Sequence, residues 1–216
     1  SESSESFTGI EEIIVTARKK EEPLQETPVT ITALTDAKIQ KLYATDSKDL
    51  GMSVPNLVIN QAASGSFSNS AAVFMRGIGN SDIDSTIDPP IGIFIDGVYV
   101  PRSSNSNLDL FDVEQVEVLR GPQGTLFGRN TTAGAIVVRS KRPTGEFGAK
   151  ARLTMGEYGR RDLRVAVEAP LSDTVNAKIS VLQQKSDGFY KARYLTHPDY
   201  SVPADRKSTR LNSSHN

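Results

Sequence analysis

Residues 112–143 carry the most regular pattern of apolar and polar positions in the chain. Val113, Val116 and Val118 are apolar, with charged or amide side chains between them, which predicts a strand. Several glycines follow, and a second β-rich run covers residues 135–139. Glycine permits positive φ and close backbone approach, so a tight strand–turn–strand unit is expected, in which Gly121 and Gly124 need to be glycine. The P-loop lysine and the G-x-G-x-x-G spacing are both missing, which argues against nucleotide binding.

Upstream, short apolar runs alternate with polar loops. Thr35-Asp36 is predicted to cap a helix that buries Ile39, Leu42 and Tyr43, and a second helical turn is expected at 47–52. Together with the predicted strands these helices indicate a small α+β domain with a mixed sheet. The predicted strands are residues 28–34, 56–60, 72–76 and 91–100, the last a hairpin that turns at Asp96-Gly97.

From residue 147 the pattern becomes a long alternation of apolar and charged positions. Ala151, Leu153 and Met155 alternate with Lys150 and Arg152, and two further runs repeat the pattern. A soluble sandwich shows the same period, but an apolar outer face and a charged inner face are typical of a membrane β-barrel. About three strands fit before the chain stops, which is too few to close a barrel. We therefore expect residues 147–204 to be a truncated piece of antiparallel barrel.

The N-terminal region combines a polar tail with one short β-prone run. Residues 1–9 are rich in Ser and Glu, which predicts disorder, and residues 11–17 read EEIIVTA. A strand with no sequence neighbour to pair with is a candidate for addition to the sheet edge of another protein. The alternative is that this run forms the first edge strand of the chain's own sheet.

Composition excludes several kinds of chemistry. The 216 residues carry a net charge of -1, so nothing favours nucleic acid or anionic lipid as a partner. Cysteine is missing, and the mean hydropathy of -0.34 suits either a soluble protein or a membrane barrel. His197 and His215 are the only histidines, so no catalytic residues and no cofactor are predicted. Asp82, Asp84 and Asp88 share one loop without EF-hand spacing, so we expect no metal site.

Residues 205–215 match, codon by codon, a translated sequencing-library adapter. We treat residues 205–216 as an artefactual tail and exclude them from reasoning about the fold. The first residue is Ser1 rather than methionine, and no charged-then-apolar leader follows. The chain is therefore expected to be a mature or trimmed product.

Three segments together resemble the plug domain of TonB-dependent outer-membrane receptors. These are FMRGIG at 74–79, IFIDGVY at 93–99, and VEVLRGPQG running into GRN and an AGAI strand at 116–136. They occur in the family's order, and the resemblance covers residues 11–200. It implies a flexible N-terminus at 1–25, a plug domain at 26–143 and the first barrel strands at 147–204.

The resemblance also assigns roles to particular residues. From their alternation with apolar residues, Glu114 and Glu117 are expected to pair with Arg76, Arg120 or Arg129 inside the globule. In the family, plug arginines pair with barrel carboxylates. The plug motif comprises Arg76, Gly77, Asp96, Gly97, Glu117, Arg120, Gly121, Pro122, Gly124, Gly128, Arg129, Asn130 and Gly134. The TonB-box-like residues are Ile13, Ile14, Val15, Thr16 and Ala17. The residues expected to face ligand from polar loops are Ser66, Phe67, Asn69, Asn80, Asp82, Asp84, Arg102 and Asn105.

The function implied by the resemblance is gated uptake across the bacterial outer membrane. The plug occludes the barrel and senses external ligand, and periplasmic TonB pulls the N-terminal box to open a path. Ferric siderophore is the expected substrate, and carbohydrate or another bulky nutrient is the alternative. A soluble periplasmic binding module is a further alternative, and an enzyme is disfavoured. The outer-membrane lipid would surround the complete barrel, and this chain alone is not expected to transport.

Overall fold

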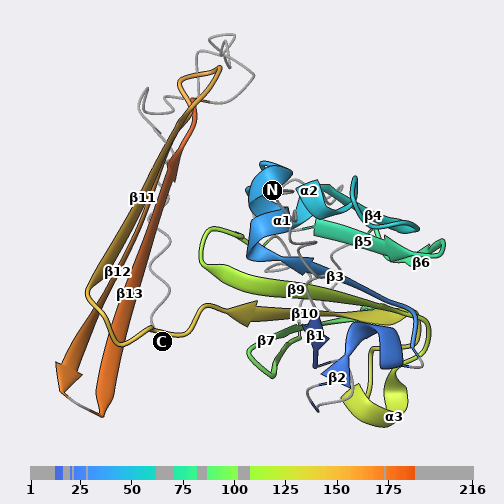
Figure 1. Cartoon of the computed structure of the whole chain (residues 1–216). Coiled ribbons are helices and arrows are strands. Elements are labelled where there is room, and N and C mark those ends of the chain that lie inside the picture. The colour runs from blue at the N-terminus through green and yellow to red at the C-terminus, as the bar shows by residue number, and fades with distance from the viewer. Residues whose placement is uncertain are drawn as a thin grey trace, which may run out of the picture. The chain divides into compact units, whose positions relative to one another are not determined.

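The computed structural model describes residues 13–16, 20, 22–27, 29–61, 71–81, 87–101, 108–172 and 174–187. The chain divides into two compact units between Lys141 and Arg142 (Figure 1). The N-terminal unit holds three sheets and all the helices of the described residues. The C-terminal unit is one three-stranded antiparallel sheet.

A five-stranded mixed sheet is the centre of the N-terminal unit, with strand order β3-β9-β10-β7-β8. The long strand β9 (Val113–Arg120) pairs antiparallel with β3 (Ile31–Thr35) and with β10 (Gly134–Ser140). Strand β10 runs parallel to β7 (Ile91–Ile95), which forms an antiparallel hairpin with β8 (Val98–Val100). The predicted strand–turn–strand unit is thus confirmed as β9, the glycine turn and β10.

One face of this sheet packs against helices and a small second sheet. The covering elements are α1 (Asp36–Lys41), α2 (Ser47–Leu50) and the antiparallel strands β4 (Leu57–Gln61), β5 (Ala71–Met75) and β6 (Ile78–Gly79). Apolar burial on this face is the main stabilising term, at about 1.5–3 kcal/mol for each large side chain. The core includes Leu34, Ile39, Leu50, Leu57, Met75, Ile93, Val116, Val118, Ile136 and Val138.

The first helix is shorter than predicted, and two of its expected core residues are exposed. Ile39 is buried, but Leu42 and Tyr43 are 41% and 89% exposed. Leu42 is already the C-cap, and Tyr43 has a φ of 52°, in the left-handed region. The chain therefore leaves the helix two residues early, and Ala44 enters the core instead.

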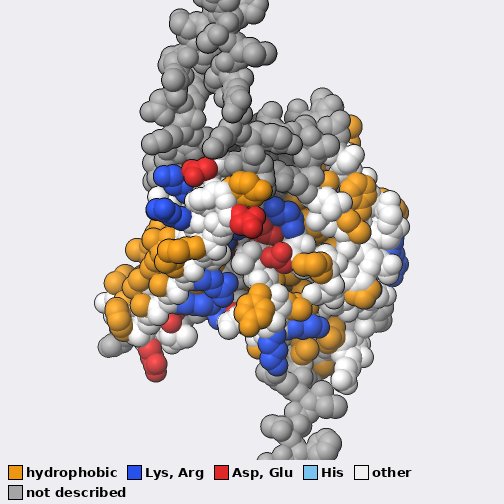
Figure 2. Space-filling view, turned by 90° about the horizontal axis from the view of Figure 1, so that it is seen from above, with side chains coloured by type: hydrophobic (Ala, Val, Ile, Leu, Met, Phe, Trp, Pro, Cys, Tyr) orange, Lys and Arg blue, Asp and Glu red, His pale blue; other side chains and the backbone are white. Residues whose placement is uncertain are grey.

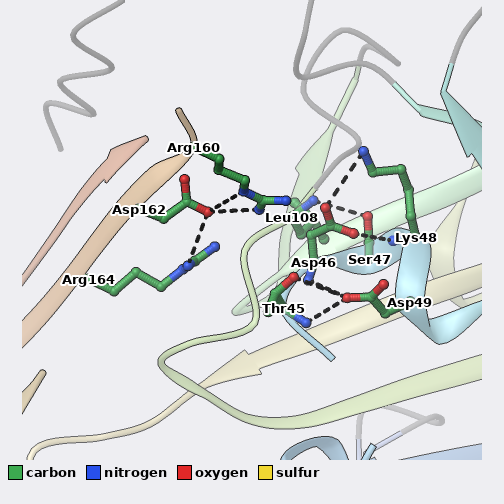
Figure 3. Close-up of polar contacts among 9 residues, drawn as sticks. All are labelled: Thr45, Asp46, Ser47, Lys48, Asp49, Leu108, Arg160, Asp162 and Arg164. Atoms are coloured by element: carbon green, nitrogen blue, oxygen red, sulfur yellow. Dashed lines mark hydrogen bonds and ion pairs between the residues drawn. The ribbon is translucent and has the colours of Figure 1, made fainter. Parts of the chain in front are cut away.

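The second helix is only four residues long and depends on its cap. A carboxylate oxygen of Asp46 accepts from the backbone N of Lys48 at 2.9 Å. In return, Asp49 Oδ2 accepts from the backbone N of Thr45 at 2.7 Å and of Asp46 at 3.3 Å (Figure 3). This reciprocal capping box offsets the cost of nucleating so short a helix. Within the described residues, no helix has the length and apolarity needed to span a bilayer.

The other face of the five-stranded sheet carries a smaller apolar cluster and the N-terminal strand. Phe94, Leu119, Ala135 and Val137 are buried there, and Phe127 of helix α3 (Gly124–Phe127) packs on them. Strand β1 (Ile14–Val15), its partner β2 (Glu22–Pro23) and the 3-10 turn η1 (Leu24–Glu26) complete the described elements of this unit. Two polar residues of β9, Gln115 and Glu117, are also buried.

The C-terminal unit follows the predicted alternation. Strands β11 (Gly148–Met155), β12 (Arg161–Ser172) and β13 (Val175–Lys185) form an antiparallel meander. On β12, Asp162 and Arg164 are buried whereas Leu163 and Val167 are exposed. Asp162 Oδ2 accepts from Arg160 at 2.7 Å and lies 3.7 Å from Arg164 Nη1 (Figure 3). Exposed apolar side chains gather on this unit (Figure 2), and those more than half exposed include Leu153, Met155, Ile179 and Val181.

Candidate functional site

The β-prone run at the N-terminus is a strand of the chain's own fold. Ile14 pairs with Pro23 and Val15 with Glu22, and the backbone N of Leu24 donates to Ile13 O at 2.9 Å. Val15 is only 1% exposed, so this strand is docked rather than free. Ala17, the last of the five TonB-box-like residues, lies outside the described residues.

Two polar side chains of β9 hold the docked strand in place. Glu117 Oε1 accepts from the backbone N of Thr16 at 2.8 Å and from its hydroxyl at 3.0 Å. The amide of Gln115 donates to Ile14 O at 3.0 Å and to the same Glu117 oxygen at 3.2 Å. The segment Ile13–Thr16 is therefore fixed by side chains about 100 positions away, as well as by its two-residue ladder.

Glu117 is a carboxyl group whose acidity is changed by its surroundings. Burial raises the pKa of Glu117 above its ordinary value, while the two Thr16 hydrogen bonds and the charge of Arg139 partly oppose the rise. The predicted pairing of Glu117 with Arg76, Arg120 or Arg129 is wrong. The described hydrogen-bond partners are Thr16 and Gln115, because Glu117 faces the side of the sheet on which β1 docks.

Arg120, at the end of β9, joins neighbouring elements on the opposite face. Its guanidinium donates to Thr32 Oγ1 at 3.2 Å and to Pro55 O at 3.4 Å. Glu114, which was also expected to meet an arginine, is exposed. Arg120 thus ties β3 and the segment before β4 to the start of the glycine turn.

The glycine turn between β9 and β10 is closed by a ladder of backbone hydrogen bonds. Gly121 N donates to Ala133 O, and Gln123 N donates to Thr131 O, both at 2.9 Å. The hydroxyl of Thr131 donates to Gly128 O at 2.7 Å. Gly121 has a φ of 105°, a conformation that only glycine adopts without strain.

Two other glycines of the turn differ sharply in their surroundings. A Cβ on Gly134 would collide with the carbonyl oxygen of Leu119 and the sulfur of Met75, so this position requires close backbone approach. Gly124 begins α3, has no positive φ, and an added Cβ would meet nothing within 4 Å. The prediction that Gly124 needs to be glycine is therefore wrong, because a helix start tolerates other residues.

The two upstream motifs are tight hairpin turns. Arg76 and Gly77 have φ of 51° and 81°, and Asp96 and Gly97 have φ of 49° and 84°. Positive φ at both central residues is the geometry that matches the twist of paired strands. Asp96 also accepts from the backbone N of Ser140 at 2.8 Å, which fastens the β7–β8 turn to the end of β10. The predicted turn at Asp96-Gly97 is confirmed.

Asn130 connects the glycine turn to an aromatic cluster. It has a φ of 65°, and its amide donates to Tyr99 Oη at 2.8 Å. Tyr99 and Phe127 flank Phe94, with ring centroids 5.4 Å and 4.9 Å from it. Asn130 therefore fixes β8 to α3 through the tyrosine, whereas Pro122 and Arg129 are exposed.

Most of the predicted ligand-facing positions fall outside the described residues. These are Ser66, Phe67, Asn69, Asp82, Asp84, Arg102 and Asn105. Asn80 is half-buried after β6, and Asp88 is exposed. Gly134, the first residue of β10, pairs with Ile91, the first residue of β7, and with Arg120, the last residue of β9. The start of β7 therefore lies at the same end of the five-stranded sheet as the glycine turn.

Sequence reasoning missed four side chains that organise this site. Gln115 and Glu117 interrupt an apolar strand, and that interruption was the available sign of a polar function on a buried face. Met75 and Tyr99 gave no such sign, because each acts on a partner distant in sequence. The missed residues are Met75, Tyr99, Gln115 and Thr131.

Comparison with known proteins gives consistent results. The family described as TonB-dependent receptor plug domain matches residues 23–135. The catecholate siderophore receptor Fiu of Escherichia coli K12 is 29% identical over 165 residues, which is 76% of this chain and 20% of the relative. The vitamin B12 transporter BtuB of Vibrio vulnificus is 25% identical over 178 residues, covering 82% of this chain and 28% of the relative.

A solved structure shows the same fold. The ferric yersiniabactin uptake receptor FyuA of Yersinia pestis superposes with a TM-score of 0.64 at 24% identity, over 72% of this chain and 24% of that receptor. The architecture is thus an α+β plug followed by antiparallel strands of a transmembrane barrel. The chain belongs to the TonB-dependent receptor plug domain family. It spans between a fifth and a third of the length of these relatives.

Proposed function

We propose that this chain forms the plug and first barrel strands of a bacterial outer-membrane receptor that imports a ferric siderophore. In this proposal residues 1–25 carry the TonB box on the periplasmic side, 26–143 form the plug inside the barrel, and 147–204 begin the barrel. TonB supplies the energy for opening by pulling on the N-terminal segment. The complete receptor, rather than this chain alone, performs the transport.

The observation that carries the proposal is the docked strand immediately before the plug. Residues 13–16 precede the family match, which begins at residue 23. Two ladder pairs, the backbone hydrogen bond from Leu24 N to Ile13 O, and the side chains of Gln115 and Glu117 hold them. So small an attachment suits a segment that must leave the plug and add to a strand of a partner.

The relatives' names favour iron carriers as substrate. Fiu is named for catecholate siderophores and FyuA for ferric yersiniabactin uptake, whereas BtuB is named for vitamin B12. The alternative, another bulky nutrient, is supported by BtuB, which is 25% identical to this chain compared with 29% for Fiu. The Ser- and Asn-rich segments 62–70, 82–86 and 102–107 offer hydrogen-bonding groups for either kind of ligand.

The C-terminal sheet supports placement in the outer membrane. Its exposed apolar side chains alternate with charged ones, as lipid-facing and lumen-facing positions alternate in a barrel. Each unpaired backbone group in lipid costs several kcal/mol, so a spanning sheet has to close. The remaining strands of the complete receptor would supply that closure.

The proposal is tested by uptake of radioactive iron into cells that express the complete receptor containing this chain. A panel of ferric siderophores is supplied to cells with and without TonB, and labelled vitamin B12 serves as the competing substrate. The proposal predicts TonB-dependent accumulation of at least one ferric siderophore and none of the vitamin. Accumulation of vitamin B12 alone would show that the substrate is not a ferric siderophore. Uptake without TonB would overturn the proposed TonB-driven mechanism.

A further inference from the structure

Glu117 lies where an ionised carboxylate is poorly accommodated. It stands between Ala33 of β3 and Val137 of β10, the residues directly opposite it in the sheet, and is 0% exposed. All three donors that reach it converge on Oε1. The second oxygen, Oε2, is buried without a hydrogen-bond partner. Such an oxygen is a favourable place for a proton, since protonation removes the buried charge and leaves Oε1 free to accept.

The charged groups around this carboxyl do not neutralise it fully. On the same face, Arg139 of β10 lies opposite Gln115 and attracts the carboxylate, while β3 and α3 contribute no charged side chain to the described part. On the docked hairpin, Lys20 and Glu22 lie 3.7 Å apart as an ion pair. Arg18 and Lys19 are outside the described residues. The net result of burial, hydrogen bonds and Arg139 is a raised pKa for Glu117.

We propose that Glu117 is a proton-sensitive latch for the N-terminal strand, whose protonated carboxyl holds Ile13–Thr16 on the sheet more firmly than its carboxylate does. This inference rests on the proposed function in one respect: the segment that the latch would regulate is the one proposed as the TonB box. When the segment leaves, water reaches Glu117 and its acidity returns toward that of an ordinary glutamic acid. Docking and proton binding are therefore linked.

The direction of the linkage follows from the raised pKa. The docked form binds the proton more tightly than the undocked form, so acid favours docking. Docking is strongest below the ordinary glutamate pKa and weakens as the pH rises through the raised pKa of the docked form. Each unit of difference between the two pKa values changes the docking equilibrium about tenfold. Above the raised pKa of the docked form the latch is in its weaker state, in which a partner captures the strand more readily.

The latch can be tested without TonB or substrate on the full chain, kept in detergent because its C-terminal sheet exposes apolar side chains. Because the chain has no cysteine, Ile14→Cys creates a unique attachment site for a nitroxide spin label, at a side chain that is 39% exposed. In the electron paramagnetic resonance spectrum, the mobile fraction reports the undocked strand and the immobile fraction the docked strand. Because the label is already attached when the pH is changed, the pH dependence of thiol reactivity does not affect these fractions. Spectra are recorded from about pH 4 to about pH 8, spanning the range of an upward-shifted glutamate. Val98→Cys on β8 provides a reference label away from the strand.

The expected result is a mobile fraction that grows with pH in the labelled chain and stays low and constant when Glu117→Gln is added. Glu114→Gln, an exposed carboxyl on the same strand, is the matched control and should keep the pH dependence. Arg139→Gln provides an independent readout that does not alter the latch residue, and removal of its positive charge should move the midpoint to higher pH. Circular dichroism confirms that each variant is folded.

Three results would overturn the latch. These are a mobile fraction that rises on acidification, a pH dependence that persists in Glu117→Gln, and an unchanged or lowered midpoint in Arg139→Gln. Each leaves the transport proposal untouched, since uptake is measured separately. Conversely, if the complete receptor showed no TonB-dependent uptake, the proposed function would fail while the spectra of the labelled chain would be unchanged.

Discussion

Glu117 accepts hydrogen bonds from both the backbone N–H and the hydroxyl of Thr16, across 101 residues of sequence. The pair joins the long strand β9 of the plug sheet to the segment proposed to couple with TonB. A donor–acceptor pair of this kind contributes about 0.5–1.5 kcal/mol, or more when one partner is charged. The docked strand is thus held by interactions of a size that a partner protein can outcompete.

Removal of the Thr16 hydroxyl should loosen the strand. Thr16→Val keeps the shape and the backbone N–H but loses one of the donors to Glu117 Oε1. A loss of about 1 kcal/mol corresponds to a roughly fivefold rise in the undocked population. The spin label at position 14 measures that fraction directly, and Thr16→Ser, which keeps the hydroxyl, should stay near the parent value. Equal spectra for both variants would show that the hydroxyl contributes nothing.

Two glycines of the turn should respond differently to the same substitution. Gly121→Val forces a β-branched residue to a φ of 105° and should destabilise the plug by about 1–3 kcal/mol. Gly124→Val, at an open position without positive φ, should change stability by less than about 1 kcal/mol. Denaturant unfolding of both variants makes the comparison, and equal destabilisation would show that the φ of Gly121 is not what constrains it.

Asn130 should matter for two separable reasons. Asn130→Ala loses both the hydrogen bond to Tyr99 and the tolerance of asparagine for a φ of 65°, at a combined cost of about 1–3 kcal/mol. Tyr99→Phe removes only the hydroxyl partner and should cost about 0.5–1.5 kcal/mol. Thermal unfolding of the two variants compares the costs. A larger effect from Tyr99→Phe would mean that the backbone conformation of Asn130 is unstrained for alanine.

The C-terminal sheet should make fragments of this chain insoluble. Its exposed apolar residues include Met155 and Ile179, and within the described residues β11 and β13 each have one unpaired edge. Residues 1–204 should therefore self-associate, while residues 1–143, which keep the plug sheet, should be more soluble. Sedimentation and circular dichroism at equal concentration make the comparison. A monomeric longer fragment beside an unfolded shorter one would place the domain boundary after residue 143.

The sequence predicted the elements of the plug because each strand and turn has a local cause. The alternation in β9, the hairpin turn at Asp96-Gly97 and the alternation in β11 are all set by nearest neighbours. The left-handed φ of Tyr43 ended the first helix early and exposed a side chain that helical periodicity had placed in the core. Periodicity alone does not reveal where a helix stops.

The candidate site was harder to predict, because its contacts join distant segments. Alternation along β9 gave Glu117 as a polar position, but only the pairing of β9 on both sides makes that position buried. The partner of Glu117 was expected to be an arginine and is Thr16. The N-terminal run was correctly expected to be a strand, yet its pairing with β2 depends on a reversal that no turn motif announced.

Coupling of the N-terminal strand to uptake is tested most directly by Val15→Pro in the complete receptor. Proline removes the N–H that strand addition requires and fixes φ. Val15→Ala keeps the N–H and leaves φ free, so it is the matched control. The measurement is TonB-dependent uptake of the ferric siderophore together with its binding to whole cells. We predict that Val15→Pro abolishes uptake and leaves binding intact, whereas Val15→Ala retains both. Normal uptake by Val15→Pro would contradict the assignment of Ile13–Ala17 as the TonB-coupling segment.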